Sequence, residues 1–79
     1  MAKDSNIVHQ YFRKELDDAV LLVRLNPIRL VVAEITVYRE SEPTFRELEV
    51  DEEIIADLQA DGFTEASPLE FNLYLSGLA

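Results

Sequence analysis

The sequence predicts a small α+β domain, and two observations lead to this fold class. Some segments repeat apolar residues at helical spacing, while others alternate apolar and polar residues or are rich in β-branched side chains. The chain has 79 residues, of which 48% are hydrophobic, and this share is too high for a disordered acidic tail. We therefore expect a single domain over residues 1–79, with its elements in the order α-β-β-α-β.

Residues 4–25 are expected to form the first helix. Apolar side chains recur between Ile7 and Val23 at steps of one, three and four residues, which is the pattern of one helix face. The dipeptide Asn26-Pro27 would end this helix, because proline lacks an N–H and disfavours helical geometry in the residue before it.

An alternative for residues 20–25 is an extra strand that turns at Asn26-Pro27 into the following strand. The sheet would then have four strands instead of three. If the segment is helical, Leu21 and Leu22 lie outside its main apolar stripe, and exposed leucines at these positions indicate a contact surface.

Two strands are expected in the middle of the chain, over residues 28–40 and 44–50. The first is rich in β-branched residues, and its first half is apolar on both faces. This pattern is typical of a central strand that is covered on both sides. A short turn at residues 41–43 connects the two strands.

A second helix is expected over residues 51–61. Asp51 is a favourable N-cap residue, and Gly62 suits the left-handed conformation that often ends a helix. Phe63 is then expected to pack back on Leu58, as in many helix ends of this type.

The last expected element is a strand over residues 69–75, which begins after Pro68. Apolar and polar residues alternate there without interruption, and this period of two is typical of a strand with one buried face. The inward residues would be Leu69, Phe71, Leu73 and Leu75.

These elements are expected to form a three-stranded, mainly antiparallel sheet with both helices on one face. The last strand would pair with the long strand at residues 28–40. The other face of the sheet would then be partly apolar and uncovered, and the first helix would add its spare leucines to the contact surface. The candidate interface residues are Leu21, Leu22, Leu30, Val32, Tyr38 and Tyr74.

Negative charge is concentrated in the C-terminal part of the chain. There are 16 acidic and 7 basic residues, for a net charge of −9, and residues 47–79 contain no base. This distribution disfavours direct binding to nucleic acid or to an anionic membrane, and it favours a basic protein partner or a role in solubility. The candidate acidic partner-binding surface consists of Glu47, Glu49, Glu52, Glu53 and Asp57.

No motif for catalysis, for a metal or for a cofactor stands out. The lack of cysteine excludes disulfides, iron–sulfur clusters and thiolate zinc sites, and it favours a cytoplasmic location. His9 is the only histidine, and Gly62 and Gly77 are isolated rather than clustered in a phosphate-binding loop. No apolar run is long enough to cross a bilayer. We therefore expect no cofactor, no metal and no catalytic residues.

The function predicted from these features is a small non-enzymatic protein–protein interaction or regulatory module. A homodimer is expected, because a thin core and an uncovered sheet face favour a partner. One alternative is an acidic mimic of nucleic acid that inhibits a basic partner. Another is a small-molecule binder or enzyme with a site formed between chains, with His9, Arg29, Tyr38 and Arg39 as its first candidates.

Overall fold

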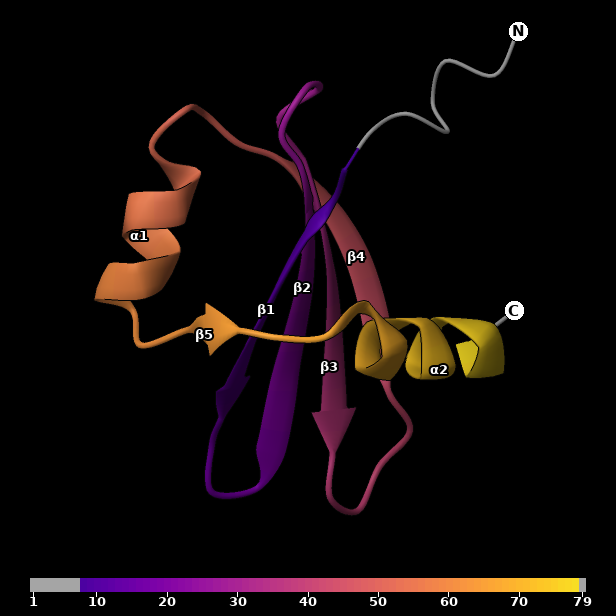
Figure 1. The fold of residues 1–79 in the computed structure, drawn as a ribbon. Helices are drawn as coiled ribbons and strands as arrows, with labels where there is room; N and C mark the ends of the chain where they lie inside the picture. The colour runs from indigo at the N-terminus through magenta and orange to yellow at the C-terminus, as the bar shows by residue number, and fades with distance from the viewer. Residues whose placement is uncertain (1–7, 79) are drawn as a thin grey trace, which may run out of the picture.

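The computed structural model describes residues 8–78 and has a five-stranded antiparallel sheet with two helices (Figure 1). The α+β class is confirmed, whereas the order α-β-β-α-β and the three-stranded sheet are wrong. The elements along the chain are β1 (Gln10–Glu15), β2 (Ala19–Asn26), β3 (Val31–Tyr38), β4 (Thr44–Glu49), α1 (Ile54–Ala60), β5 (Thr64–Glu65) and α2 (Pro68–Leu78).

Strands β1 to β4 form an antiparallel meander in which each strand pairs with the next one along the chain. The order across the sheet is β4-β3-β2-β1-β5. After β4 the chain passes through α1 and reaches the opposite edge of the sheet, where the short strand β5 pairs with β1 (Figure 1). The two edges are therefore very different, because β5 covers only two residues of β1 while β4 forms a full strand.

The helix expected over residues 4–25 is wrong, because the described part of this segment forms β1 and β2. Strand β2 is central and covered on both faces, so that Leu22, Val23 and Leu25 are each only 1% exposed. Adjacent buried side chains interrupt the alternation of a strand and imitate helical spacing. Residues 4–7, where the helix was expected to start, lie outside the described residues.

The alternative of an extra strand at residues 20–25 is confirmed by β2, which turns directly into β3, but the four-stranded sheet expected with it is wrong because β1 and β5 bring the number of strands to five. The side-chain oxygen Oδ1 of Asn26 accepts hydrogen bonds from the backbone N–H groups of Ile28 and Arg29, each at 3.0 Å. Leu30 donates its N–H to the Asn26 carbonyl at 2.9 Å and has a φ of 56°. The asparagine thus stabilises a turn in which a leucine adopts the left-handed conformation.

The two middle strands are confirmed with shorter bounds. Strand β3 lies within the expected range 28–40, and β4 lies within 44–50. In the register between them, Val32 pairs with Leu48 and Glu34 pairs with Arg46.

The helix expected over residues 51–61 is confirmed as α1, but it begins only at Ile54. Asp51 Oδ1 accepts the N–H of Glu53 at 3.0 Å, and the Asp51 carbonyl accepts the N–H of Ile54 at 3.2 Å. The structure assigns the N-cap position to Glu53, which makes no side-chain cap hydrogen bond. Asp51 therefore stabilises the turn before the helix rather than the helix end itself.

The end of α1 follows the expected pattern. Gly62 has a φ of 94° and donates its N–H to the Gln59 carbonyl at 3.1 Å. Phe63 donates its N–H to the Leu58 carbonyl at 3.0 Å, and both side chains belong to the same buried cluster. These two bonds form a Schellman motif, in which glycine supplies the left-handed residue.

The strand expected over residues 69–75 is wrong, because this segment is helix α2. Phe71 is 1% exposed and Leu75 is half-buried, whereas Leu69 and Leu73 are 68% and 65% exposed. Residues four positions apart share a face in a helix as well as in a strand, so the alternation was compatible with both structures. Pro68 at the first helical position, directly after a serine, is the start signal that favours the helix.

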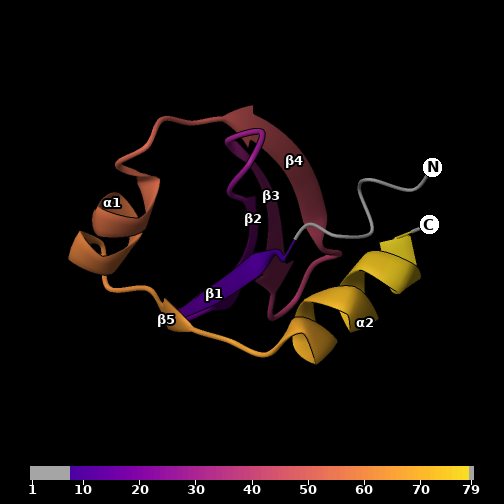
Figure 2. The same cartoon turned by 45° about the horizontal axis from the view of Figure 1, so that its top comes forward.

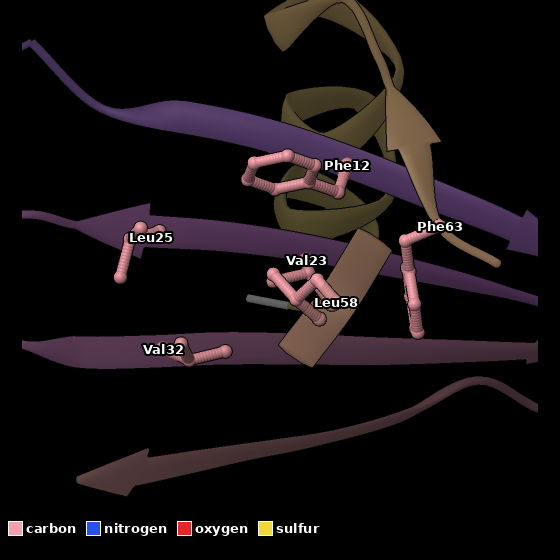
Figure 3. Close-up of a cluster of buried hydrophobic side chains, with 6 residues drawn as sticks. All are labelled: Phe12, Val23, Leu25, Val32, Leu58 and Phe63. Carbon is pink, nitrogen blue, oxygen red and sulfur yellow. The ribbon is translucent and has the colours of Figure 1, made fainter. Parts of the chain in front are cut away.

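The core has two layers, one on each face of the sheet. Figure 3 shows Leu58 of α1 lying over β2 between the side chains that β1, β2 and β3 direct to this face, with Phe63 beside it. On the other face Phe71 of α2 packs on Leu22, Ala33 and Ile35. The helices thus lie on opposite faces (Figure 2), and the expected arrangement with both helices on one face is wrong.

Candidate interaction surface at the edge of β4

The outer edge of β4 is the feature of the fold that is most open to a partner. Strand β4 is the last strand in the sheet order and pairs with β3 on one side only. All of its residues, Thr44–Glu49, are exposed. Among residues 8–78, no other strand pairs with its outer side.

The register shows which backbone groups of β4 point outward. Val50 donates its N–H to the Leu30 carbonyl at 2.9 Å, and Leu48 and Arg46 occupy the equivalent positions further along the ladder. In an antiparallel pair the inward and outward groups alternate along the strand. The N–H and C=O groups of Arg46 and Leu48 therefore face β3, and those of Phe45, Glu47 and Glu49 face away from the sheet.

The side chains of β4 divide between the two faces of the sheet. Leu48 pairs with Val32, so Thr44, Arg46 and Leu48 lie on the face covered by α1. The buried residues on this face, called the α1-side cluster below, are Phe12, Val23, Leu25, Val32, Leu58 and Phe63. Phe45, Glu47 and Glu49 lie on the face covered by α2. Phe45 is 43% exposed and Leu48 is 40% exposed, so each face of the edge presents an apolar group.

Arg46 is the one base on β4, and it is already paired. Its Nε donates to Oε1 of Glu34 at 2.6 Å across the β3–β4 ladder. Glu47 and Glu49 are exposed, and within the described part of the chain neither forms an ion pair or a side-chain hydrogen bond. The carboxylates on the α2 side of this edge therefore remain available to a partner.

All five members of the predicted acidic surface are exposed, but they do not lie on one face. Glu47 and Glu49 are on the α2 side of the sheet, and Asp57 is on α1, on the other side. Glu52 and Glu53 lie in the turn that connects β4 to α1. The acids thus follow the end of β4 and the chain that leaves it.

The residues of the predicted apolar interface do not lie together in the structure. Leu22 and Val32 are buried, and Leu21 packs against the α1-side cluster. Tyr38 is exposed at the end of β3 on the α1 side, while Tyr74 is exposed on α2 on the other side. The two tyrosines are therefore not neighbours.

Leu30 is partly buried in the β2–β3 turn. Within the described residues, the exposed apolar side chains outside the predicted interface are Val8, Leu16, Ile28, Phe45, Leu48, Leu69 and Leu73. Phe45 and Leu48 lie on β4, and Leu69 and Leu73 are exposed because their segment is helix α2 rather than the expected strand.

The candidates for a small-molecule site are divided between two shallow hollows at opposite ends of the sheet. His9 and Arg29 line one hollow together with Arg24, Asn26, Val31, Ala33 and Glu47. Tyr38 and Arg39 line the other, near the turn after β3. The Arg24 guanidinium is 5.2 Å from the centre of the Phe71 ring, so this base packs on the core as well as facing the hollow.

His9 lies beside Arg24 in the hollow at the β2–β3 end of the sheet. Burial lowers the pKa of its imidazole below the ordinary value of 6.5, and the positive charge of Arg24 lowers it further. Within residues 8–78 no group of three or more possible metal ligands occurs.

Comparisons with family models, with curated proteins and with solved structures gave no match to this chain. In the part of the chain that the structure describes, neither helix has the length and apolar character needed to cross a membrane.

Proposed function

We propose that this protein is a non-enzymatic interaction module that binds a partner protein by adding one of the partner's strands to β4. The observation that carries the proposal is the open outer edge of β4, with the backbone groups of Phe45, Glu47 and Glu49 directed away from the sheet. Strand addition of this kind uses main-chain hydrogen bonds for affinity and alternate side chains for specificity. A cytoplasmic location, suggested by the lack of cysteine, is part of this proposal.

The edge is a better candidate than either face of the sheet. Each face is covered by a helix that buries a side chain against the sheet, Leu58 from α1 and Phe71 from α2. Those contacts are needed by the domain itself, because a chain of this size buries only about 60% of its unfolded surface. Exposed strand edges are also a liability that proteins usually shorten, cover or charge.

The nucleic-acid mimic has less support. Mimicry requires carboxylates spaced like phosphates on one surface, whereas Glu47 and Asp57 lie on opposite sides of the sheet. The homodimer stays a prediction of the sequence.

A proline at an outward position tests the proposal. Glu47→Pro removes an N–H that faces away from β3, so it blocks an added strand while leaving the β3–β4 ladder intact. Glu47→Thr is the matched control, because it removes the same carboxylate but keeps the N–H in a residue that favours strands. Each tagged full-length variant is used to capture partners from a lysate of the native host.

The proposal predicts that a partner retained by the wild type and by Glu47→Thr is lost from Glu47→Pro. If Glu47→Pro retains the partner as well as the wild type does, binding through the edge is excluded. Phe45→Pro removes a second outward N–H, and it replaces Glu47→Pro in the capture experiment if circular dichroism shows that Glu47→Pro is unfolded.

A further inference from the structure

We infer that the strand added to β4 is a basic extended segment of a partner protein, with Lys or Arg at two positions that lie opposite Glu47 and Glu49. The inference rests on the proposed function, since it names the chemistry of the partner at the same edge. Glu47 and Glu49 are two residues apart, so both carboxylates stand on one face of the strand. Bases spaced in the same way on the added strand would meet them directly.

The charged side chains of β4 on the α2 side, and those of the turn that follows it, are acidic. Glu47 and Glu49 are followed by Asp51, Glu52 and Glu53, with no base among residues 47–53. The base on β4, Arg46, projects from the other face and pairs with Glu34. A cationic strand would therefore meet the carboxylates of Glu47 and Glu49 on the α2 side of β4, and such complementary charge increases both the association rate and the specificity of binding.

Arg24 and Arg29 do not cancel this attraction. Both line the hollow beside Glu47, but they lie on the inner side of β4. Arg24 belongs to β2, which is two strands away from β4, or about 10 Å at the usual spacing of strands. The added strand would lie on the outer side, about 5 Å from β4, where Glu47 and Glu49 are the charges that β4 presents on the α2 side, while Arg46 projects to the α1 side and pairs with Glu34.

The same charges disfavour the pairing of two copies through β4. An antiparallel dimer must match outward residues with outward residues, and two registers give the longest overlap. One places Glu47 opposite Glu47 of the second copy, and the other places Arg46 opposite its own equivalent. Like charges directly opposite each other on paired strands are destabilising. A basic segment from another protein is therefore a better occupant than a second copy.

The register also predicts the neighbours of the two bases. In an antiparallel addition, successive partner residues lie opposite Glu49, Leu48, Glu47, Arg46 and Phe45. The complementary pattern is base, apolar, base, small polar, apolar. Leu48 and Phe45 are both partly exposed, so an apolar residue opposite each of them would remove apolar surface from water.

A pair of peptides tests this pattern. The probe is acetyl-Ser-Lys-Val-Lys-Thr-Val-Ser-amide, and the matched peptide has Glu at both Lys positions. Each is titrated into the 15N-labelled full chain, and the amide shifts of residues 45–49 are followed by NMR, which detects binding at millimolar affinity. The inference predicts that the basic peptide shifts the amides of Phe45, Glu47 and Glu49, that added salt weakens its binding, and that the acidic peptide does not bind.

The double variant Glu47→Gln/Glu49→Gln separates charge from backbone. It keeps both outward N–H groups, and it should weaken the basic peptide about tenfold, since each opposite-charge pair across a strand contributes a modest amount. Equal binding of both peptides, unchanged binding by the double variant, or no binding of the basic peptide at millimolar concentration overturns the inference.

The two proposals fail in different ways. If the partner from the lysate is lost from Glu47→Pro while the double variant binds it as the wild type does, the edge is used but its occupant is not basic. If the β4 shifts appear on raising the protein concentration without peptide, the occupant is a second copy and the inference is wrong.

Discussion

Arg13 of β1 and Glu70 of α2 are joined by a hydrogen-bonded ion pair, in which Nε donates to Oε1 at 3.1 Å. The two residues are 57 positions apart, so the pair connects the first strand to the last helix. Arg13 also lies 3.2 Å from a carboxylate oxygen of Glu15. Burial acts to lower the pKa of the Arg13 guanidinium, but its bonds to Glu15 and Glu70 raise the pKa overall.

The first prediction concerns how much the Arg13–Glu70 pair contributes to the free energy of unfolding. The side chains of Arg13 and Glu70 are 30% and 36% exposed, so water and salt screen the pair. Glu70→Gln should lower the free energy of unfolding by no more than about 1 kcal/mol, and the loss should shrink in high salt. Urea denaturation at two salt concentrations measures it, with Glu52→Gln as the exposed control. A loss of several kcal/mol that salt does not change would contradict the assignment of a screened surface pair.

The second prediction tests helix α2. Phe71→Ala removes a side chain that is 1% exposed, touches the Tyr11 ring edge-on and packs on Leu22, and it should cost about 3–5 kcal/mol. Leu73→Ala, two residues along the chain, should cost less than about 0.5 kcal/mol, because Leu73 is 65% exposed.

The difference between the effects of Phe71→Ala and Leu73→Ala distinguishes a helix from a strand at residues 68–78. In the strand expected from the alternation, residues 71 and 73 would both face the core and both substitutions would be severe. Equal and large losses of stability in thermal or urea unfolding would therefore contradict the helix.

Ambiguous periodicity explains the two wrong elements. In β2, Leu22 and Val23 are both buried because a helix covers each face of the sheet, so the strand loses its alternation. The same pattern was recognisable in the β-branched segment 28–40, but in the leucine-rich segment 20–25 it fits a helix as well as a strand covered on both sides. In α2, Leu69 and Leu73 repeat at four residues, which fits a strand and a helix equally well.

Elements with specific local signals were predictable. The end of α1 at Gly62 and Phe63 follows from backbone conformation that few residues other than glycine adopt easily. The acidic surface was recognisable as exposed, because Glu47 and Glu49 alternate with other residues on a short strand. Its position at a sheet edge agrees with the expected pairing, in which residues 28–40 form the central strand, whereas the strands beyond β3 were not predictable because residues 20–25 also fit a helix.

The third prediction compares the two glycines. Gly62→Ala should destabilise the protein by about 1–2 kcal/mol, because a side chain is strained at a φ of 94°. The added Cβ would lie 3.7 Å from Lys14 Cε, which is ordinary contact, so the loss would come from the backbone. Gly77→Ala near the end of α2 meets nothing within 4 Å and should be neutral or stabilising by up to about 1 kcal/mol. Equal effects on the melting temperature would contradict the helix end assigned to Gly62.

The fourth prediction concerns His9 and pH. Because the folded protein lowers the pKa of His9 below 6.5, the unfolded chain binds a proton more readily between the two values. The neutral form of His9 therefore makes its full contribution to the stability of the fold above the unfolded pKa of 6.5, and this contribution is lost as the pH falls through the folded pKa. NMR titration should give a pKa below 6.5, and Arg24→Gln should raise it.

The pH dependence of the free energy of unfolding provides an independent check on the His9 titration. His9→Gln should flatten the part of the pH–stability curve that lies between the folded pKa and about 6.5. A His9 pKa above 6.5 would contradict the burial of this side chain and the effect of the Arg24 charge on it.

The most direct test of the open edge is amide hydrogen exchange along β4 in the free protein at low concentration. The account predicts alternation, with slow exchange at Arg46 and Leu48, whose N–H groups face β3, and fast exchange at Phe45, Glu47 and Glu49. Uniform protection of all these amides at low concentration would mean that the outer side of β4 is already covered. That result would contradict the proposal that this edge is available to a partner.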